Sequence, residues 1–288
     1  MKTIKSLKHT LSEVMLVFLI AIGWAALSGI EDVVLGLFQV DTKSLPLHLY
    51  MVSTLYCEGI AVIAMLIRYR KRPLLLGISA GHRRAIHDYL LGMMLGGIVF
   101  ATIWALIVLQ GGYAIRYVYN IRNSGLIVLY LLGFMIQSLF EELVCRGYIM
   151  GYWLERGHIL SSILLNALLF MALHFNNPGF NRQAALGIFL FGVLMSLVRL
   201  ACGNIWLGAA FHAVWNFCEG LVFGTAVSGL PNISLIIKSV SDTSHRAITG
   251  GKFGVESSPT SILVHIVAII FMLIMIRKHR AAQSLVLS

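Results

Sequence analysis

Apolar residues fill most of this sequence in long stretches separated by short polar or basic segments. Eight stretches approach or exceed the roughly 20 residues that a membrane-spanning helix needs. They cover residues 13–38, 47–68, 88–110, 124–154, 158–175, 184–200, 203–224 and 260–277. The pattern predicts an all-α polytopic membrane protein with about eight transmembrane helices that enclose an intramembrane polar cavity. The first stretch is overlong and contains Glu31 and Asp32, so we expect it to break or tilt near Gly29.

The composition supports the same fold class. Hydrophobic residues make up 58% of the 288 residues and charged residues only 12%, against roughly 25% charged residues in soluble domains. No polar stretch is long enough for a separate soluble domain, so we expect a single integral membrane domain over residues 1–288. Nucleic-acid binding is excluded on the same ground, because no soluble basic fold is available to display the positive charge.

Positive charge is distributed unevenly between the connecting segments. The formal net charge is +10, and if the N-terminus is cytoplasmic, 15 of the 22 Lys and Arg residues fall on the inner side and 7 on the outer side. Short cytoplasmic segments carry an excess of Lys and Arg. We therefore expect a multi-pass protein with both termini in the cytoplasm. The basic segment 68–84 follows from this topology, and attraction of anionic lipids or an acidic substrate is a secondary hypothesis.

The longest segment of low apolar content, residues 225–259, falls on the predicted outer side. Long loops are often functional. Two interpretations stay open, an ordered lid or connector and a substrate-gating loop, and we favour the first.

Residues 140–147, FEELVCRG, place three charges inside an apolar stretch. Glu142 and Arg146 are four residues apart on a helix, with the acid first, which is the favourable order for an ion pair. Glu141 is turned by about 100° from Glu142 and is left free of that arginine. A free carboxylate in an apolar pocket is suited to act as a general base. The pair itself has a structural interpretation, in which it anchors the helix.

Two further segments carry polar residues at helical spacing. Asn166, Phe170 and His174 share one helix face, which Asn177 continues, and His212 and Asn216 share another, which Glu219 continues. An imidazole and an amide on one face are suited to donate hydrogen bonds to a developing oxyanion. Each pattern alone is weak, because a buried histidine is often only a hydrogen-bonded core residue.

The depth of these residues in the membrane decides whether they meet. Counted from the inner ends of their helices at 1.5 Å per residue, Glu141, His174 and His212 all lie roughly 20–25 Å up. Unrelated buried polar residues would not be expected at one height. The sequence therefore predicts a composite catalytic site of Glu141, His174, His212 and Asn216.

These residues form the motifs EExxxR (Glu141, Glu142, Arg146), FxxxH (Phe170, His174) and HxxxN (His212, Asn216). In this order they resemble the CAAX protease and bacteriocin-processing (CPBP) family of intramembrane metalloproteases. That family includes the CAAX prenyl endopeptidase and bacteriocin self-immunity proteins. The motif core spans about 124–224.

The resemblance implies that Glu141 and His174 activate a water molecule, while His212 and Asn216 stabilise the tetrahedral oxyanion. Glu142, Arg146 and Phe170 would support the geometry of the site. Metal dependence stays undecided, because the chain lacks HExxH and a catalytic zinc normally takes three protein ligands. The tentative ligands are Glu141, His174 and His212, and the alternatives are a divalent metal such as zinc or no cofactor.

The leading hypothesis is an intramembrane endopeptidase in a bacterial plasma membrane. Its partners would be membrane lipids and a hydrophobic, lipidated or membrane-associated peptide substrate, and the oligomeric state is left open. The alternative is a non-enzymatic immunity protein that binds a bacteriocin or its receptor. A transporter is disfavoured, because no internal repeat is visible.

Overall fold

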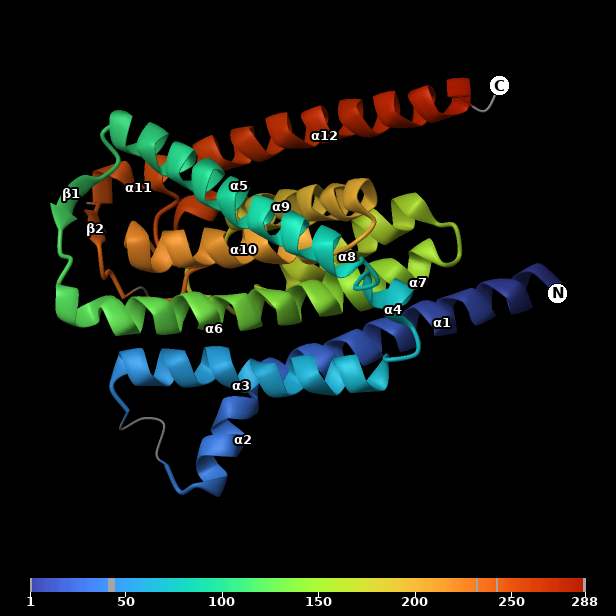
Figure 1. The fold of residues 1–288 in the computed structure, drawn as a ribbon, viewed down its shortest axis with the longest axis horizontal. Coiled ribbons are helices and arrows are strands. Elements are labelled where there is room, and N and C mark those ends of the chain that lie inside the picture. Colours follow the sequence, from blue (N-terminus) through green and yellow to red (C-terminus); the bar gives the residue numbers. More distant parts are fainter. Residues whose placement is uncertain (1, 41–44, 232, 242, 287–288) are drawn as a thin grey trace.

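The structure is a computed structural model that describes residues 2–40, 45–231, 233–241 and 243–286. Its helices are α1 (Lys2–Ala25), α2 (Ile30–Leu37), α3 (Leu47–Arg68), α4 (Pro73–Leu76), α5 (His82–Leu109), α6 (Ser124–Glu142), α7 (Met150–Leu154), α8 (Ile159–Leu173), α9 (Arg182–Cys202), α10 (Trp206–Phe217), α11 (Arg246–Thr249) and α12 (Pro259–Val286). The long helices lie roughly along one common axis, and α1 begins at the same end of the bundle at which α12 ends (Figure 1). The expected all-α fold class is confirmed, with a two-stranded ribbon of β1 (Ala114–Tyr117) and β2 (Ile237–Val240) as its small β element.

The expected count of about eight membrane-spanning helices is not confirmed by the helices of the structure. Within the described residues, five helices are long and apolar enough to cross a membrane. They are Leu47–Arg68, His82–Leu109, Ile121–Leu154, Arg182–Cys202 and Pro259–Lys278, and Ser12–Ala25 and Ile159–Leu173 are shorter apolar helices. The chain is a multi-pass membrane protein by this composition, but a count of eight is not confirmed.

The first apolar stretch breaks, as its length and its acidic residues predicted. α1 ends at Ala25, a 3-10 turn covers Ala26–Gly29, and α2 then points away from the bundle (Figure 1). Glu31 at the start of α2 is buried and accepts a hydrogen bond from Tyr50 Oη at 3.5 Å. The side chain of Asp32 lies outside the described residues. The break therefore keeps Glu31 against α3 rather than in lipid.

Helix α10, which carries the HxxxN motif, is packed tightly against α5. A Cβ atom added at Gly92 would lie 2.3 Å from the carbonyl oxygen of Leu207, and one added at Gly96 would lie 2.4 Å from that of Phe211. Glycines four residues apart let two membrane helices approach this closely. The residue after Phe211 is His212, so this contact fixes the height and rotation of a predicted catalytic residue.

Gly96→Ala is expected to destabilise the protein by about 1–3 kcal/mol, because the added methyl group forces α5 and α10 apart. Thermal unfolding in detergent measures the loss. Gly97→Ala is the matched control, since its Cβ would meet Val214 Cγ1 at an ordinary 3.5 Å. Equal melting temperatures for the two variants would contradict this account of the packing.

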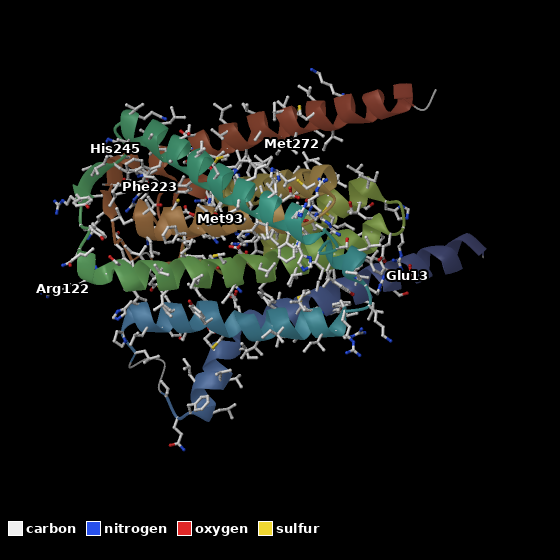
Figure 2. The ribbon with its side chains drawn as sticks, viewed as in Figure 1. Glu13, Met93, Arg122, Phe223, His245 and Met272 are labelled. Atoms are coloured by element: carbon white, nitrogen blue, oxygen red, sulfur yellow. The ribbon has the colours of Figure 1, made fainter. Side chains whose placement is uncertain are left out.

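The described residues of segment 225–259 form a cap at one end of the bundle (Figure 1), and their interpretation as a lid or connector stays a prediction. β2 pairs antiparallel with β1, with Ala114 opposite Val240 and Tyr117 opposite Ile237. Trp104 Nε1 on α5 donates to Ser239 Oγ at 2.9 Å. Phe223 lies beside this ribbon, whereas Glu13 lies toward the other end of the bundle (Figure 2).

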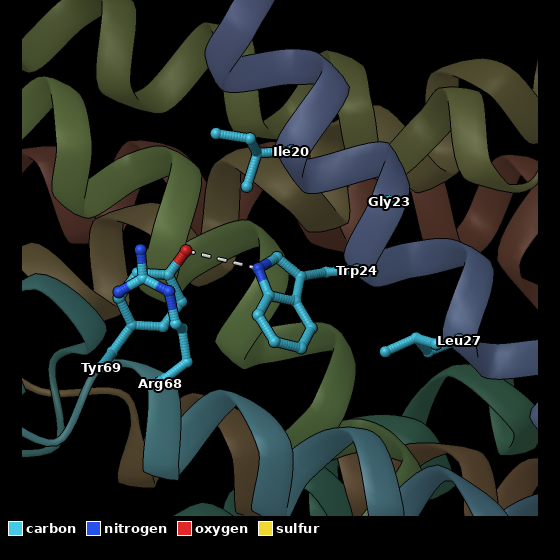
Figure 3. Close-up of a pocket in the computed structure, with 6 residues that line it drawn as sticks. All are labelled: Ile20, Gly23, Trp24, Leu27, Arg68 and Tyr69. Carbon is cyan, nitrogen blue, oxygen red and sulfur yellow. Dashed lines mark hydrogen bonds between the residues drawn. The ribbon is translucent and has the colours of Figure 1, made fainter.

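A groove of about 410 Å³ opens where the end of α1 meets the end of α3 (Figure 3). Its lining residues are Ile20, Gly23, Trp24, Leu27, Arg68 and Tyr69. Trp24 Nε1 donates to Tyr69 Oη at 3.3 Å, and the Tyr69 ring lies 5.5 Å from that of Tyr148. The groove thus borders the helix that follows FEELVCRG, but none of the predicted catalytic residues lines it.

Candidate active site

The segment FEELVCRG lies where α6 changes into a π-helical turn. α6 ends at Glu142 and the backbone continues as π-helix over Leu143–Ile149. Arg146 Nη1 donates to Glu142 Oε1 at 2.9 Å, and the two side chains are only 0% and 1% exposed. The ion pair expected from the spacing is therefore present and withdrawn from solvent. π-Helical turns within α-helices occur frequently at functional sites.

His212 on α10 lies between the two glutamates of this segment. Its Nδ1 is 3.3 Å from Glu142 Oε1, and its Nε2 is 3.6 Å from Glu141 Oε2. Because a carboxylate only accepts, Nδ1 is the donor toward Glu142. Glu141 Oε2 is buried and has no hydrogen-bond partner among the described residues. Glu142 is thus engaged by Arg146 and His212, whereas Glu141 Oε2 faces the second ring nitrogen of His212 without a hydrogen bond.

The ring of Phe170 connects the arginine to both histidines. Arg146 Cζ lies 4.2 Å from the centre of this ring, which is a cation–π contact. The ring centres of His174 and His212 lie 4.8 and 5.8 Å from that of Phe170. His174 Nδ1 lies 2.7 Å from the carbonyl oxygen of Phe170 and must be its donor, so in the neutral ring Nε2 is unprotonated.

Asn216 is buried one turn beyond His212. Its Nδ2 donates to Gln137 Oε1 at 3.1 Å, while its Oδ1 has no partner among the described residues. α10 then ends at Phe217 and continues as a second π-helical turn over Cys218–Val222. The backbone therefore changes to π-helix within the EExxxR motif on α6, and directly after the HxxxN motif on α10.

The structure thus brings Glu141 from α6, His174 from the end of α8, and His212 and Asn216 from α10 into one region. Residues 123–218, which include all four, match the model of the family described as type II CAAX prenyl endopeptidase Rce1-like. The motif core of the chain is therefore similar to this CAAX protease family. No curated protein matches the chain.

The CAAX protease family is a family of proteases, and the match supports a hydrolytic activity for this chain. The resemblance drawn from the three motifs is therefore confirmed. The match says nothing of metal dependence or bacteriocin immunity, and the roles of the individual residues stay predictions.

Glu256 is a further buried acid near this site that the sequence did not single out. It lies in the 3-10 turn Val255–Ser257 just before α12, and its Oε2 accepts from Ser228 Oγ at 2.5 Å. The carbonyl oxygen of Ser228 accepts from Asn177 Nδ2 at 2.9 Å, three residues after His174. Segment 225–259 is thereby fastened to the turn that follows the FxxxH motif. Only a long-range contact identifies Glu256, since no helical spacing links it to the motifs.

Burial raises the pKa of the Glu256 carboxyl above its ordinary value. The hydrogen bond from Ser228 and the nearby His174 and His212 oppose that rise, while Glu141 adds to it. Glu256 therefore lies within electrostatic range of three predicted catalytic residues. Because its folded-state pKa is above the unfolded value, its favourable contribution to stability is full below about pH 4.3 and is lost as the pH rises through the folded-state pKa.

In the Glu256→Gln variant, the melting temperature is accordingly expected to decrease less with rising pH than it does in the wild type. Gln keeps an acceptor for Ser228 but carries no titrating group. The melting temperature of the wild type minus that of the variant should fall as the pH increases from about 4. Thermal unfolding in detergent across a pH series measures this difference. A difference that is constant or rises with pH would contradict the assignment of Glu256 as a buried acid with a raised pKa.

The tentative metal ligands are not arranged as a three-ligand site. Among the described residues, no three His, Cys, Asp or Glu side chains form a group that could hold a metal ion. Glu141 Oε2 and His212 Nε2 lie 3.6 Å apart, but His174 does not join them in one group of possible ligands. The residues as placed do not fit a zinc site with these three ligands.

Two other polar residues of the motif helices make local contacts, Asn166 through its side chain and Glu219 through its backbone. Asn166 Nδ2 donates to Ser196 Oγ at 2.9 Å and to backbone carbonyls of its own helix. Glu219 is fully buried in the π-helical turn, and its backbone carbonyl oxygen accepts from the backbone nitrogen of Thr225 at 2.8 Å. Asn166 joins α8 to α9 rather than contributing to the site.

Proposed function

We propose that this protein is an intramembrane endopeptidase that hydrolyses a peptide bond in a hydrophobic, lipidated or membrane-associated peptide. The observation that carries the proposal is the position of Glu141, which presents a buried, unpartnered carboxylate oxygen next to His212 Nε2. The family match supports the same reaction. A prenylated peptide is the first substrate to test, because the matching family is named for CAAX prenyl endopeptidases.

In this proposal Glu141 and His174 activate the water. Glu141 Oε2 has no competing hydrogen bond, and His174 Nε2 is left as an acceptor because Nδ1 donates to Phe170. Two acceptors from different helices orient a water molecule with its lone pair toward the substrate carbonyl carbon. As the water oxygen bonds to that carbon, its proton passes to the Glu141 carboxylate, which is the general base.

His212 and Asn216 stabilise the oxyanion that this attack forms. A protonated His212 donates from both ring nitrogens, from Nδ1 to Glu142 and from Nε2 to the oxyanion. Asn216 adds a side-chain N–H group. When the intermediate collapses, the C–N bond breaks and the departing amine takes the proton held by Glu141. The buried Glu142–Arg146 pair holds His212 in place during these steps.

The topology proposed from the charge distribution places both termini in the cytoplasm of a bacterial cell. The shared position of the start of α1 and the end of α12 (Figure 1) supports an even number of crossings. The site would then be reached from within the bilayer by a membrane-bound peptide.

The proposal is tested with purified protein in detergent and a quenched fluorescent peptide in which a prenylated cysteine is followed by three residues. In ¹⁸O-labelled water, the wild type is expected to release the peptide fragment with one ¹⁸O atom in its new carboxyl terminus. Mass spectrometry of the product detects the label. Release of unlabelled product, or no release above that of a Glu141→Ala preparation, would count against hydrolysis by this site.

The non-enzymatic alternative predicts a different result in cells. If the protein only binds a bacteriocin or its receptor, a folded Glu141→Ala variant should protect cells as well as the wild type does. The endopeptidase proposal predicts that protection, where it exists, is lost with that variant.

A further inference from the structure

Gln137 is a polar residue on α6 that belongs to none of the three motifs. It lies four residues before Glu141, so the two side chains share one face of α6. Gln137 Oε1 accepts from Asn216 Nδ2 at 3.1 Å and from Ser138 Oγ at 3.2 Å. Gln137 therefore joins α6 to α10 at the level of the proposed oxyanion donor.

This contact decides which end of the Asn216 amide faces α6. The oxygen and nitrogen of an Asn side chain are nearly equal in size, so packing alone does not distinguish its two orientations. The acceptor Gln137 Oε1 opposite Nδ2 distinguishes them, and the donation from Ser138 Oγ to the same oxygen sets the orientation of the Gln137 amide itself. With Gln137 Oε1 in place, the donor end of Asn216 lies on the side of Glu141, and one of its two N–H bonds remains free. The reversed amide would present Oδ1 there, and an oxyanion repels that oxygen.

We propose that Gln137 is a positioning residue of the site, which orients the Asn216 amide so that its nitrogen serves the oxyanion. The inference rests on the proposed function, since it assigns a part to Asn216 in peptide hydrolysis. It adds a requirement that the motifs lack, namely an acceptor one turn before the general base. Substitution of this acceptor should impair the transition state more than it impairs substrate binding.

The test is a double-mutant cycle between Gln137→Met and Asn216→Ala, with the prenylated fluorescent peptide as the probe. Asn216→Ala is expected to lower kcat by about 100-fold, as for other oxyanion donors. Gln137→Met is expected to lower kcat by roughly tenfold with KM within about twofold of the wild type. The double variant should be no slower than Asn216→Ala alone, because Gln137 acts through Asn216.

The control is Gln183→Met, the same substitution at an exposed residue at the start of α9, which should leave kcat unchanged. Two results would overturn the inference while leaving the proposed function intact. In the first, the decrease in kcat caused by Gln137→Met multiplies in full with the decrease caused by Asn216→Ala. In the second, Gln137→Met mainly raises KM and leaves kcat unchanged. A wild type that does not cleave the probe would overturn both.

Discussion

Glu141→Gln is expected to lower cleavage of the prenylated peptide by about 10³-fold, within the range of roughly 10²–10⁴ that general-base catalysis contributes. Gln has almost the same shape as Glu but cannot take the proton of the attacking water. The fold should survive, because Glu141 Oε2 makes no hydrogen bond that the variant would lose. Steady-state kinetics in detergent, with thermal unfolding on the same preparation, measures both effects.

Glu155→Gln is the matched control for this experiment. Glu155 directly follows α7 and pairs with Arg72 at the protein surface, away from the proposed site. Its substitution should leave kcat within about twofold of the wild type. If the two variants had equal activity, Glu141 would not be the general base.

Arg146→Met is expected to cause the largest loss of stability, about 3–5 kcal/mol in the free energy of unfolding. The guanidinium group is fully buried, donates to Glu142 and lies over the ring of Phe170. Met fills a similar volume but leaves a buried carboxylate with His212 as its remaining partner. Denaturant unfolding in mixed micelles measures the change, and cleavage should fall as well because His212 is no longer held.

The same substitution at Arg72 provides the control for burial. Arg72 and Glu155 form a surface ion pair, with side chains 51% and 35% exposed, and such pairs contribute only about 0–1 kcal/mol. Arg72→Met should therefore unfold close to the wild type. If Arg146→Met were no less stable than Arg72→Met, the buried pair would not anchor the site.

Much of the site followed from helical spacing within single segments. Glu142 and Arg146 are four residues apart, and so are His212 and Asn216, and one helical turn keeps such residues on one face wherever the helix lies. Counting residues along the predicted helices also places Glu141, His174 and His212 at a common depth, which stays a prediction.

Contacts between distant segments could not be found in this way. Gln137 and Asn216 are 79 residues apart, and Ser228 and Glu256 meet through a folded loop rather than a helix face. The cation–π contact of Arg146 with Phe170 also depends on how the end of α6 approaches α8. A straight α-helix was assumed for each motif, whereas the backbone changes to π-helix within the EExxxR motif and shortly after the HxxxN motif.

The fold, like the site, was predictable from the sequence only in its local features. Hydrophobic stretches predicted the all-α membrane class and the break near Gly29, because acidic residues and a long run are visible in the sequence itself. The number of crossings was not predictable in the same way. Helix length depends on turns such as Ala26–Gly29 and Cys218–Val222, which interrupt stretches that are continuous in hydrophobicity.

The central claim is that Glu141 makes this chain a protease of membrane peptides. A comparison of membrane-derived peptides by mass spectrometry, from cells producing the wild type or Glu141→Gln at equal levels, tests it without assuming a substrate. The account predicts new peptide termini in cells with the wild type and their absence in cells with the variant. Identical sets of termini in the two kinds of cell would contradict it.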